Sequence, residues 1–153
     1  MKKFVLISTV FFLFSCASTY KVGSEGESYK IPKELSVFLS SFEQNVTSYN
    51  SDNVLLHMDK AYKKEQHDDM LEGRTEQFLN EFFSGSNTDG SGFVSVKFNS
   101  IKGIHFVSIQ KNETGYTVYY TIETKEANID CSWEISVKKT EYGTKYGLIG
   151  AVG

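Results

Sequence analysis

The spacing of apolar residues changes once along this chain, and the change restricts the fold more than any other feature. Before residue 84 apolar side chains recur at the spacing of an amphipathic helix, and from residue 93 onward they alternate with polar ones, as in half-buried strands. Helices followed by strands are typical of an α+β fold, in which helices pack on one face of an antiparallel sheet. The sequence therefore predicts one α+β domain over residues 31–153.

Three helices are predicted in the first half of this domain. The first covers residues 31–49, with Pro32 near its start, where a helix has no partner for the N–H that proline lacks. The second covers residues 53–66, and a third, short helix begins near Thr75, which can cap it. The side chains predicted to face the core are those of Ile31, Leu35, Phe38, Leu39, Phe42, Val46, Tyr49, Val54, Leu55, Met58, Ala61, Tyr62, Phe78, Leu79, Phe82 and Phe83.

About five strands are predicted in the second half, joined by short loops into an antiparallel meander that forms a curved sheet. A run of Gly, Ser, Asn and Asp over residues 84–92 separates them from the helices, and we expect it to be a mobile loop. The predicted strands cover residues 93–101, 104–111, 116–125, 131–140 and 146–152.

The order of elements, together with residues 55–62 (LLHMDKAY), 72–79 (EGRTEQFL) and 131–135 (CSWEI), resembles the nuclear transport factor 2-like superfamily. This is the cone-shaped α+β fold of ketosteroid isomerases, scytalone dehydratase and polyketide cyclases. The resemblance covers residues 33–153 and implies a pocket inside the cone, where enzymes of the fold place Asp, Glu or His beside Tyr or Trp. A helix-on-sheet domain of cystatin type, usually with one main helix, is the alternative.

The N-terminus has the parts of a secretory signal, with Lys2 and Lys3 before the largely apolar residues 4–14. This apolar stretch would form a helix of about 16 Å, roughly half the thickness of a bilayer core. Residues 13–16 (LFSC) resemble the lipobox of bacterial lipoproteins, which implies that Cys16 carries diacylglycerol and begins the mature protein. The alternative is a plain secretory signal with Cys16 near the cut.

The lipobox resemblance predicts a signal peptide over residues 1–15, a lipidated Cys16 with a flexible tether over residues 16–30, and the domain beyond. Acyl chains such as palmitate on Cys16 would hold the protein to a membrane of the cell envelope, with lipid as its partner. No acidic residue precedes Glu25 in the mature part, and Ala17 follows Cys16. This resembles lipoproteins sent to the outer membrane, if the host has one.

Charge and cysteine content exclude several classes of protein. Without Lys2 and Lys3 the chain has 14 basic and 19 acidic residues, a net charge of −5, and it has no basic run. Nucleic acid is therefore not expected as a partner. Cys131 is the only cysteine besides Cys16, so no internal disulfide is possible, and we expect its thiol to be buried.

No motif of nucleophilic catalysis or phosphate binding is present. The candidates for acid–base catalysis are His57, Asp59 and His105, and each histidine has a packing role as its alternative. His105 lies in a strand that is apolar on both faces, with Val107 and Ile109 on its own face, which indicates a central, covered strand. His105 is then a core histidine or a pocket residue.

Three aromatic residues, Tyr62, Tyr120 and Trp133, are the candidates for ligand binding, because their strand or helix positions point towards the interior. Four residues at the end of the second predicted helix have side chains that can bind metal ions: Glu65, His67, Asp68 and Asp69. Consecutive side chains at a helix end diverge, however, so we predict neither a metal nor a cofactor.

Three functions are weighed on this basis. The first is a non-catalytic envelope lipoprotein domain that binds a small apolar or aromatic ligand or a protein partner, with a homodimer formed through the sheet face of Tyr119, Thr121 and Glu123. The second is an isomerase, dehydratase or cyclase with an acid–base residue in the cone. The third is an inhibitor or immunity-like module, which a large exposed apolar patch beside residues 84–92 would favour.

Overall fold

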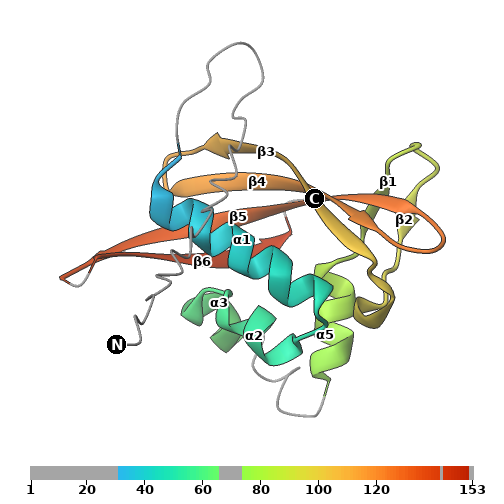
Figure 1. The fold of residues 1–153 in the computed structure, drawn as a ribbon, viewed down its shortest axis with the longest axis horizontal. Coiled ribbons are helices and arrows are strands. Elements are labelled where there is room, and N and C mark those ends of the chain that lie inside the picture. The colour runs from blue at the N-terminus through green and yellow to red at the C-terminus, as the bar shows by residue number, and fades with distance from the viewer. Residues whose placement is uncertain (1–30, 66–73, 142, 152–153) are drawn as a thin grey trace, which may run out of the picture.

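The computed structural model describes residues 31–65, 74–141 and 143–151, and Figure 1 shows their arrangement. Within these ranges four helices accompany one antiparallel sheet, and helix α1 crosses one face of that sheet. The prediction of an α+β fold is therefore confirmed. The predicted signal peptide, Cys16, the tether and the segment with His67, Asp68 and Asp69 lie outside the described residues.

The helices are α1 (Lys33–Thr47), α2 (Ser51–Leu56), α3 (Lys60–Glu65) and α5 (Thr75–Phe82). The prediction of one helix over residues 53–66 is wrong, because the chain leaves the helix between α2 and α3. There the Asp59 N–H donates to the Leu148 carbonyl oxygen and the Leu148 N–H donates to the His57 carbonyl oxygen, both at 2.8 Å. Pairing with the sheet thus replaces helical hydrogen bonds over residues 57–59.

Over the described residues the sheet has six strands, against about five predicted, and it is not closed. Their bounds are β1 (Gly85–Asn87), β2 (Phe93–Val94), β3 (Gly103–Lys111), β4 (Gly115–Glu123), β5 (Asn128–Thr140) and β6 (Gly143–Ala151). Strands β3 to β6 pair in sequence order, which confirms the predicted meander. The long strand β5 pairs with β4 along one edge, and along its other edge it pairs first with β1 and then with β6.

The first part of the sheet differs from the prediction. Only Phe93–Val94 of the predicted strand 93–101 is extended in the sheet, and a 3₁₀ turn follows at Phe98–Ser100. Residues 84–92, predicted to be a mobile loop, contain β1, which pairs with β2 and β5. Glycine makes this possible, because a Cβ at Gly85 would lie 2.4 Å from the Asp130 carbonyl oxygen.

We expect Gly85→Ala to lower the free energy of unfolding by about 1–2 kcal/mol, because the added methyl group forces β1 away from β5. Urea denaturation followed by circular dichroism measures the change. The matched control is Ser86→Ala, at the next residue, whose side chain is exposed. Equal stability of the two variants would contradict the close packing of β1 on β5.

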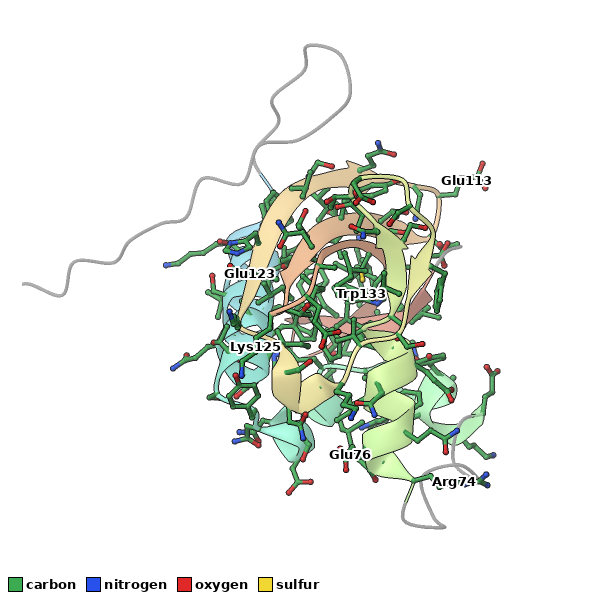
Figure 2. All side chains as sticks on the ribbon, turned by 90° about the vertical axis from the view of Figure 1, so that its right-hand side faces the viewer. Arg74, Glu76, Glu113, Glu123, Lys125 and Trp133 are labelled. Atoms are coloured by element: carbon green, nitrogen blue, oxygen red, sulfur yellow. The ribbon has the colours of Figure 1, made fainter. Side chains whose placement is uncertain are left out.

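Aromatic rings fill the space between α1 and the sheet, and Figure 2 shows Trp133 among the side chains inside the ribbon. The Trp133 ring is fully buried, stacks on Phe82 at 5.0 Å and donates from Nε1 to the Phe82 carbonyl oxygen at 3.1 Å. Phe42 of α1 and Tyr120 of β4 lie 5.7 and 5.6 Å from the same ring. Aromatic side chains therefore occupy the region where the superfamily resemblance implies a pocket.

Candidate ligand-binding groove on the sheet

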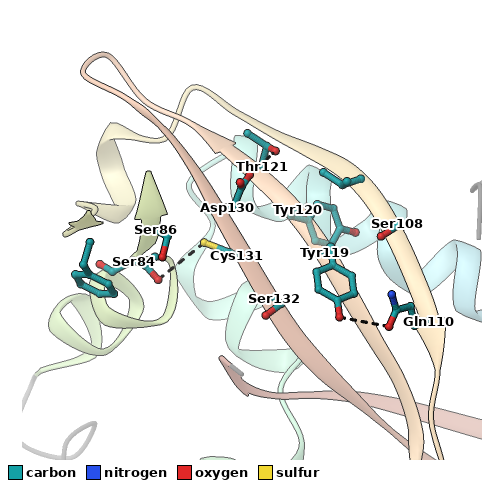
Figure 3. Close-up of a pocket in the computed structure, with 13 residues that line it drawn as sticks. Ser84, Ser86, Ser108, Gln110, Tyr119, Tyr120, Thr121, Asp130, Cys131 and Ser132 are labelled. Atoms are coloured by element: carbon teal, nitrogen blue, oxygen red, sulfur yellow. Dashed lines mark hydrogen bonds between the residues drawn. The ribbon is translucent and has the colours of Figure 1, made fainter. Parts of the chain in front are cut away.

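A groove of about 610 Å³ lies on the face of the sheet opposite α1, and Figure 3 shows it with the sheet between the groove and that helix. We call it the sheet groove. It spans from the β1–β2 hairpin across β5 and β4 to the edge strand β3. Its lining residues are Ser84, Gly85, Ser86, Phe93, Val107, Ser108, Gln110, Tyr119, Tyr120, Thr121, Asp130, Cys131 and Ser132.

The floor of the sheet groove is polar because β4 and β5 point alternate side chains away from the core. Their register places Tyr119 opposite Ser132 and Thr121 opposite Asp130. The Thr121 hydroxyl donates to Asp130 Oδ1 at 3.0 Å. Two cross-strand pairs thus put hydroxyl groups and one carboxylate side by side.

The wall on the β3 side depends on a β-bulge at Val107. The pairing with β4 shifts between Phe106 and Ser108, so Val107 is 55% exposed while Ile109 is fully buried. The prediction that Val107 and Ile109 share a face is wrong for this reason, because an extra residue reverses the alternation. The bulge also places Gln110 near Tyr119, whose hydroxyl donates to Gln110 Oε1 at 3.4 Å.

The opposite wall comes from the β1–β2 hairpin. The Ser84 hydroxyl donates to the Asn80 carbonyl oxygen at 2.7 Å and accepts from the Val96 N–H at 2.9 Å, which fixes the start of β1 between α5 and the chain after β2. Phe93 of β2 is 72% exposed and lines the groove. Large apolar side chains at Phe93 and Val107 therefore border the groove on its two sides.

Cys131 lies in the floor and is buried, as predicted. Its thiol donates to the Phe83 carbonyl oxygen at 3.3 Å. Burial raises the pKa of the Cys131 thiol to about 12, with a further contribution from the charge of Asp130. The thiol is neutral at pH 7, and a neutral thiol is a poor nucleophile.

None of the three candidates for acid–base catalysis is among the residues that line the sheet groove, although His105 is the cross-strand partner of Thr121, which does line it. His57 packs between Phe38 and Phe42, with ring distances of 5.1 and 5.8 Å, and its Nδ1 donates to the Asn53 carbonyl oxygen at 2.8 Å. Burial lowers the pKa of His57, which favours the neutral ring, and the hydrogen bond to Asn53 opposes this in part. His57 therefore has a packing role, and its Nδ1–H group already has a hydrogen-bond acceptor.

His105 is not in a central strand, and this part of the prediction is wrong. Strand β3 is an edge of the sheet, and the His105 side chain is 60% exposed, with Nε2 at 3.2 Å from Glu123 Oε2. The apolar residues around it indicate cover on both faces, but His105 and Val107 are both exposed to solvent.

Asp59 is only 7% exposed and holds the junction of α2 and α3 on the sheet. Its Oδ2 accepts from Lys138 Nζ and from the Ser136 hydroxyl, each at 2.7 Å, and its Oδ1 accepts from the Ala61 N–H at 2.7 Å. Desolvation raises its pKa, but these donors together outweigh it and lower the pKa to about 2. Asp59 is therefore a stabilising carboxylate rather than a proton acceptor at neutral pH.

Of the three candidates for ligand binding, Tyr120 alone lines the sheet groove. Its hydroxyl points to the other side of the sheet and donates to Glu43 Oε1 at 2.8 Å, and burial raises the pKa of Glu43. Trp133 lies in the core, and Tyr62 packs against Gly150 and Phe78. Strand alternation had indicated Tyr119 and Thr121 as surface residues for a homodimer, and both lie in the groove floor.

Within the described ranges, no group of three or more His, Cys, Asp or Glu side chains is placed to hold a metal ion. Among those same residues, none of the helices combines the length and the apolar character that crossing a bilayer requires. Comparisons of the chain with protein-family models, with curated proteins and with solved structures find no match.

Proposed function

We propose that this chain is a lipid-anchored protein of the cell envelope whose domain binds a small ligand in the sheet groove without transforming it. The observation that carries the binding part is a groove of about 610 Å³ with a polar floor, bordered by exposed apolar side chains at Phe93 and Val107. This size and mixture of surfaces are typical of small-molecule sites. The anchor rests on the resemblance of residues 13–16 to a lipobox, with membrane lipid as partner and the outer membrane as its place where the host has one.

The domain is, in this proposal, a divergent nuclear transport factor 2-like cone. Support comes from the helices that precede a meander of β3 to β6 and from α1 across one face of the sheet. Buried rings of Phe42, Tyr120 and Trp133 occupy the interior. The ligand site has therefore moved from the interior of the cone to the opposite face of the sheet.

Native mass spectrometry of the full chain, expressed in a bacterial host and purified in detergent, tests both parts. We expect a protein mass that lacks residues 1–15 and carries diacylglycerol on Cys16. We also expect a second species with an added non-protein mass that disappears on denaturation. An unprocessed or unacylated chain would contradict the anchor.

The variant Ser132→Trp tests the place of binding, since an indole at this position fills the floor of the sheet groove opposite Tyr119. We expect it to abolish the added mass. Glu134→Trp is the matched control, because Glu134 lies two residues further along β5 on the same face and outside the groove lining. Loss of the added mass in both variants, or in neither, would contradict binding in the groove.

A protein partner is the second candidate, and Phe93 favours it. Its side chain on the β1–β2 hairpin is 72% exposed, and exposed apolar surface next to residues 84–92 favours an inhibitor or immunity-like module. A homodimer through Tyr119 and Thr121 would cover the same groove. In the native spectra a dimer that Ser132→Trp dissociates would support this candidate against a small ligand.

An enzyme of the isomerase, dehydratase or cyclase kind has less support. His57, Asp59 and His105 lie outside the sheet groove, and Asp130 is the one carboxylate among the residues that line it. General acid–base catalysis needs groups within reach of the same reacting atoms. Each of the three is already engaged with another group: His57 with the Asn53 carbonyl oxygen, Asp59 with Lys138, and His105 with Glu123.

A further inference from the structure

We propose that the ligand of the sheet groove is an uncharged saccharide, an inference that rests on the function proposed above. The saccharide hydroxyls would bond to the floor formed by Tyr119, Thr121, Asp130 and Ser132, and a ring face would lie against Phe93. Each part of this assignment follows from the chemistry of the lining.

The charge of the lining selects against anionic ligands. Among the thirteen described residues that line the groove, none is Lys, Arg or His, and Asp130 contributes a carboxylate. A phosphate, a nucleotide or a fatty-acid carboxylate would lose water without gaining a positive partner and would be repelled by Asp130. A neutral ligand avoids this cost.

The polar groups of the lining match a ligand that is rich in hydroxyls. Serine, threonine and tyrosine hydroxyls both donate and accept, the Gln110 amide does the same through two atoms, and the Asp130 carboxylate accepts only. Sugar hydroxyls also donate and accept, so each can bridge two such groups. Hydrogen bonds from a sugar hydroxyl to Asp130 are charge-assisted and therefore stronger than neutral ones.

The exposed ring of Phe93 and the exposed methyl groups of Val107 favour a ligand that also has an apolar surface. Phe93 and Val107 are large, apolar and mostly exposed, although folding normally buries such side chains. A pyranose ring presents C–H groups on its faces and hydroxyls around its edge. Such a ring can cover Phe93 while its edge reaches the polar floor.

An extended peptide fits the groove less well than a saccharide. Peptides that join a sheet pair with the backbone of an edge strand. The groove floor is made by β4, which pairs with β3 and β5, and by β5, which pairs with β4 along the groove and with β1 at Asp130. The free edge of β3 lies on the far side of that strand from the floor. Recognition there must come from side chains, and the groove volume of about 610 Å³ suits a short oligosaccharide.

The test uses the full chain in a detergent without a sugar headgroup and three neutral probes, cellotriose, maltotriose and N,N′,N″-triacetylchitotriose. Saturation-transfer NMR and calorimetric titration measure binding. We expect at least one trisaccharide to bind, with the strongest saturation transfer to ring C–H protons. Phe93→Ser and Asp130→Asn should each weaken that binding at least tenfold, while Glu134→Gln, outside the lining, should leave it unchanged.

The outcomes separate this inference from the function on which it rests. Binding that Phe93→Ser and Asp130→Asn do not weaken would overturn the saccharide assignment. The saccharide assignment also fails if none of the three probes binds and the native spectra show a charged or purely apolar molecule that Ser132→Trp removes. In that case the proposal that the groove binds a small ligand still holds. If neither a probe nor a retained molecule is found, both proposals fail.

Discussion

Replacing Trp133 with alanine is expected to lower the free energy of unfolding by about 3–5 kcal/mol, the range for large aromatic side chains in a core. Trp133 is fully buried, and its ring contacts Phe82, Phe42, Phe83 and Tyr120 at centroid distances of 5.0 to 5.7 Å. Whole domains are stable by about 5–15 kcal/mol, so this single change removes a large part of the total. Urea denaturation followed by far-UV circular dichroism measures it, since the variant lacks the tryptophan signal.

Trp133→Phe is the matched control for this prediction. It keeps an aromatic ring between Phe42 and Phe82 but leaves the Phe82 carbonyl oxygen without its donor, the Trp133 Nε1 group. We expect a smaller loss, about 1–3 kcal/mol, from the unpaired carbonyl and the reduced volume. A loss below about 1 kcal/mol for Trp133→Ala would mean that the interior is open enough to tolerate a cavity, which contradicts the packing described above.

Asp59→Asn is expected to destabilise the protein by about 2 kcal/mol at pH 7, because it removes a buried carboxylate that accepts hydrogen bonds from Lys138, Ser136 and Ala61, although Lys138 itself is 57% exposed. The amide has one acceptor oxygen where the carboxylate has two, and it carries no charge to oppose Lys138. The change also loosens residues 57–59, which pair with β6. Urea denaturation at pH 7 gives the magnitude. Lys138→Met should cost less, because Asp59 then keeps the donors of Ser136 and Ala61.

The lowered pKa of Asp59 predicts that the free energy of unfolding depends on pH. The pKa of Asp59 is about 2 in the folded protein against 3.8 for the free side chain, so the folded state favours the ionised form. Its contribution, about 2 kcal/mol, is fully present above pH 4 and is lost as the pH falls from about 4 to about 2. Between pH 5 and pH 2 the wild type should therefore lose more stability than Asp59→Asn. Parallel pH profiles of the two proteins would contradict the ion pair.

Elements with a strong local pattern were predictable from the sequence. Helix α1 buries Leu35, Leu39, Phe42 and Val46 at helical spacing, and β4 buries Val118, Tyr120 and Ile122 in alternation. In both elements the repeat of the sequence matches the repeat of the backbone, so one face is apolar and the other polar. The burial of Trp133 on β5 followed in the same way, whereas the burial of Cys131 was expected because its thiol has no disulfide partner.

Features created by pairing between distant segments were not predictable. The strand β1 has three residues from a Gly, Ser and Asn run and exists because β5 and β2 pair with it. The break at residues 57–59 arises from β6, and the bulge at Val107 reverses an alternation that the sequence alone continues to Ile109. Both walls of the sheet groove depend on such features. Its floor was visible as the polar face of β4, although it was interpreted as a dimer surface.

One edge of β5 pairs with the short β1 and with the much longer β6, and this difference affects the order in which the strands fold and unfold. Strands β3 to β6 are consecutive hairpins, so their pairing closes only short loops, whereas Ser86 pairs with Asp130 far later in the chain. Contacts between distant segments cost more loop entropy and form more slowly. The β1–β2 hairpin therefore joins a meander that is already assembled, and it is the part that can detach by local unfolding while the rest remains folded. A ligand in the groove would contact this hairpin and hold it on the sheet. Ligand affinity and the local stability of β1 and β2 would therefore be coupled.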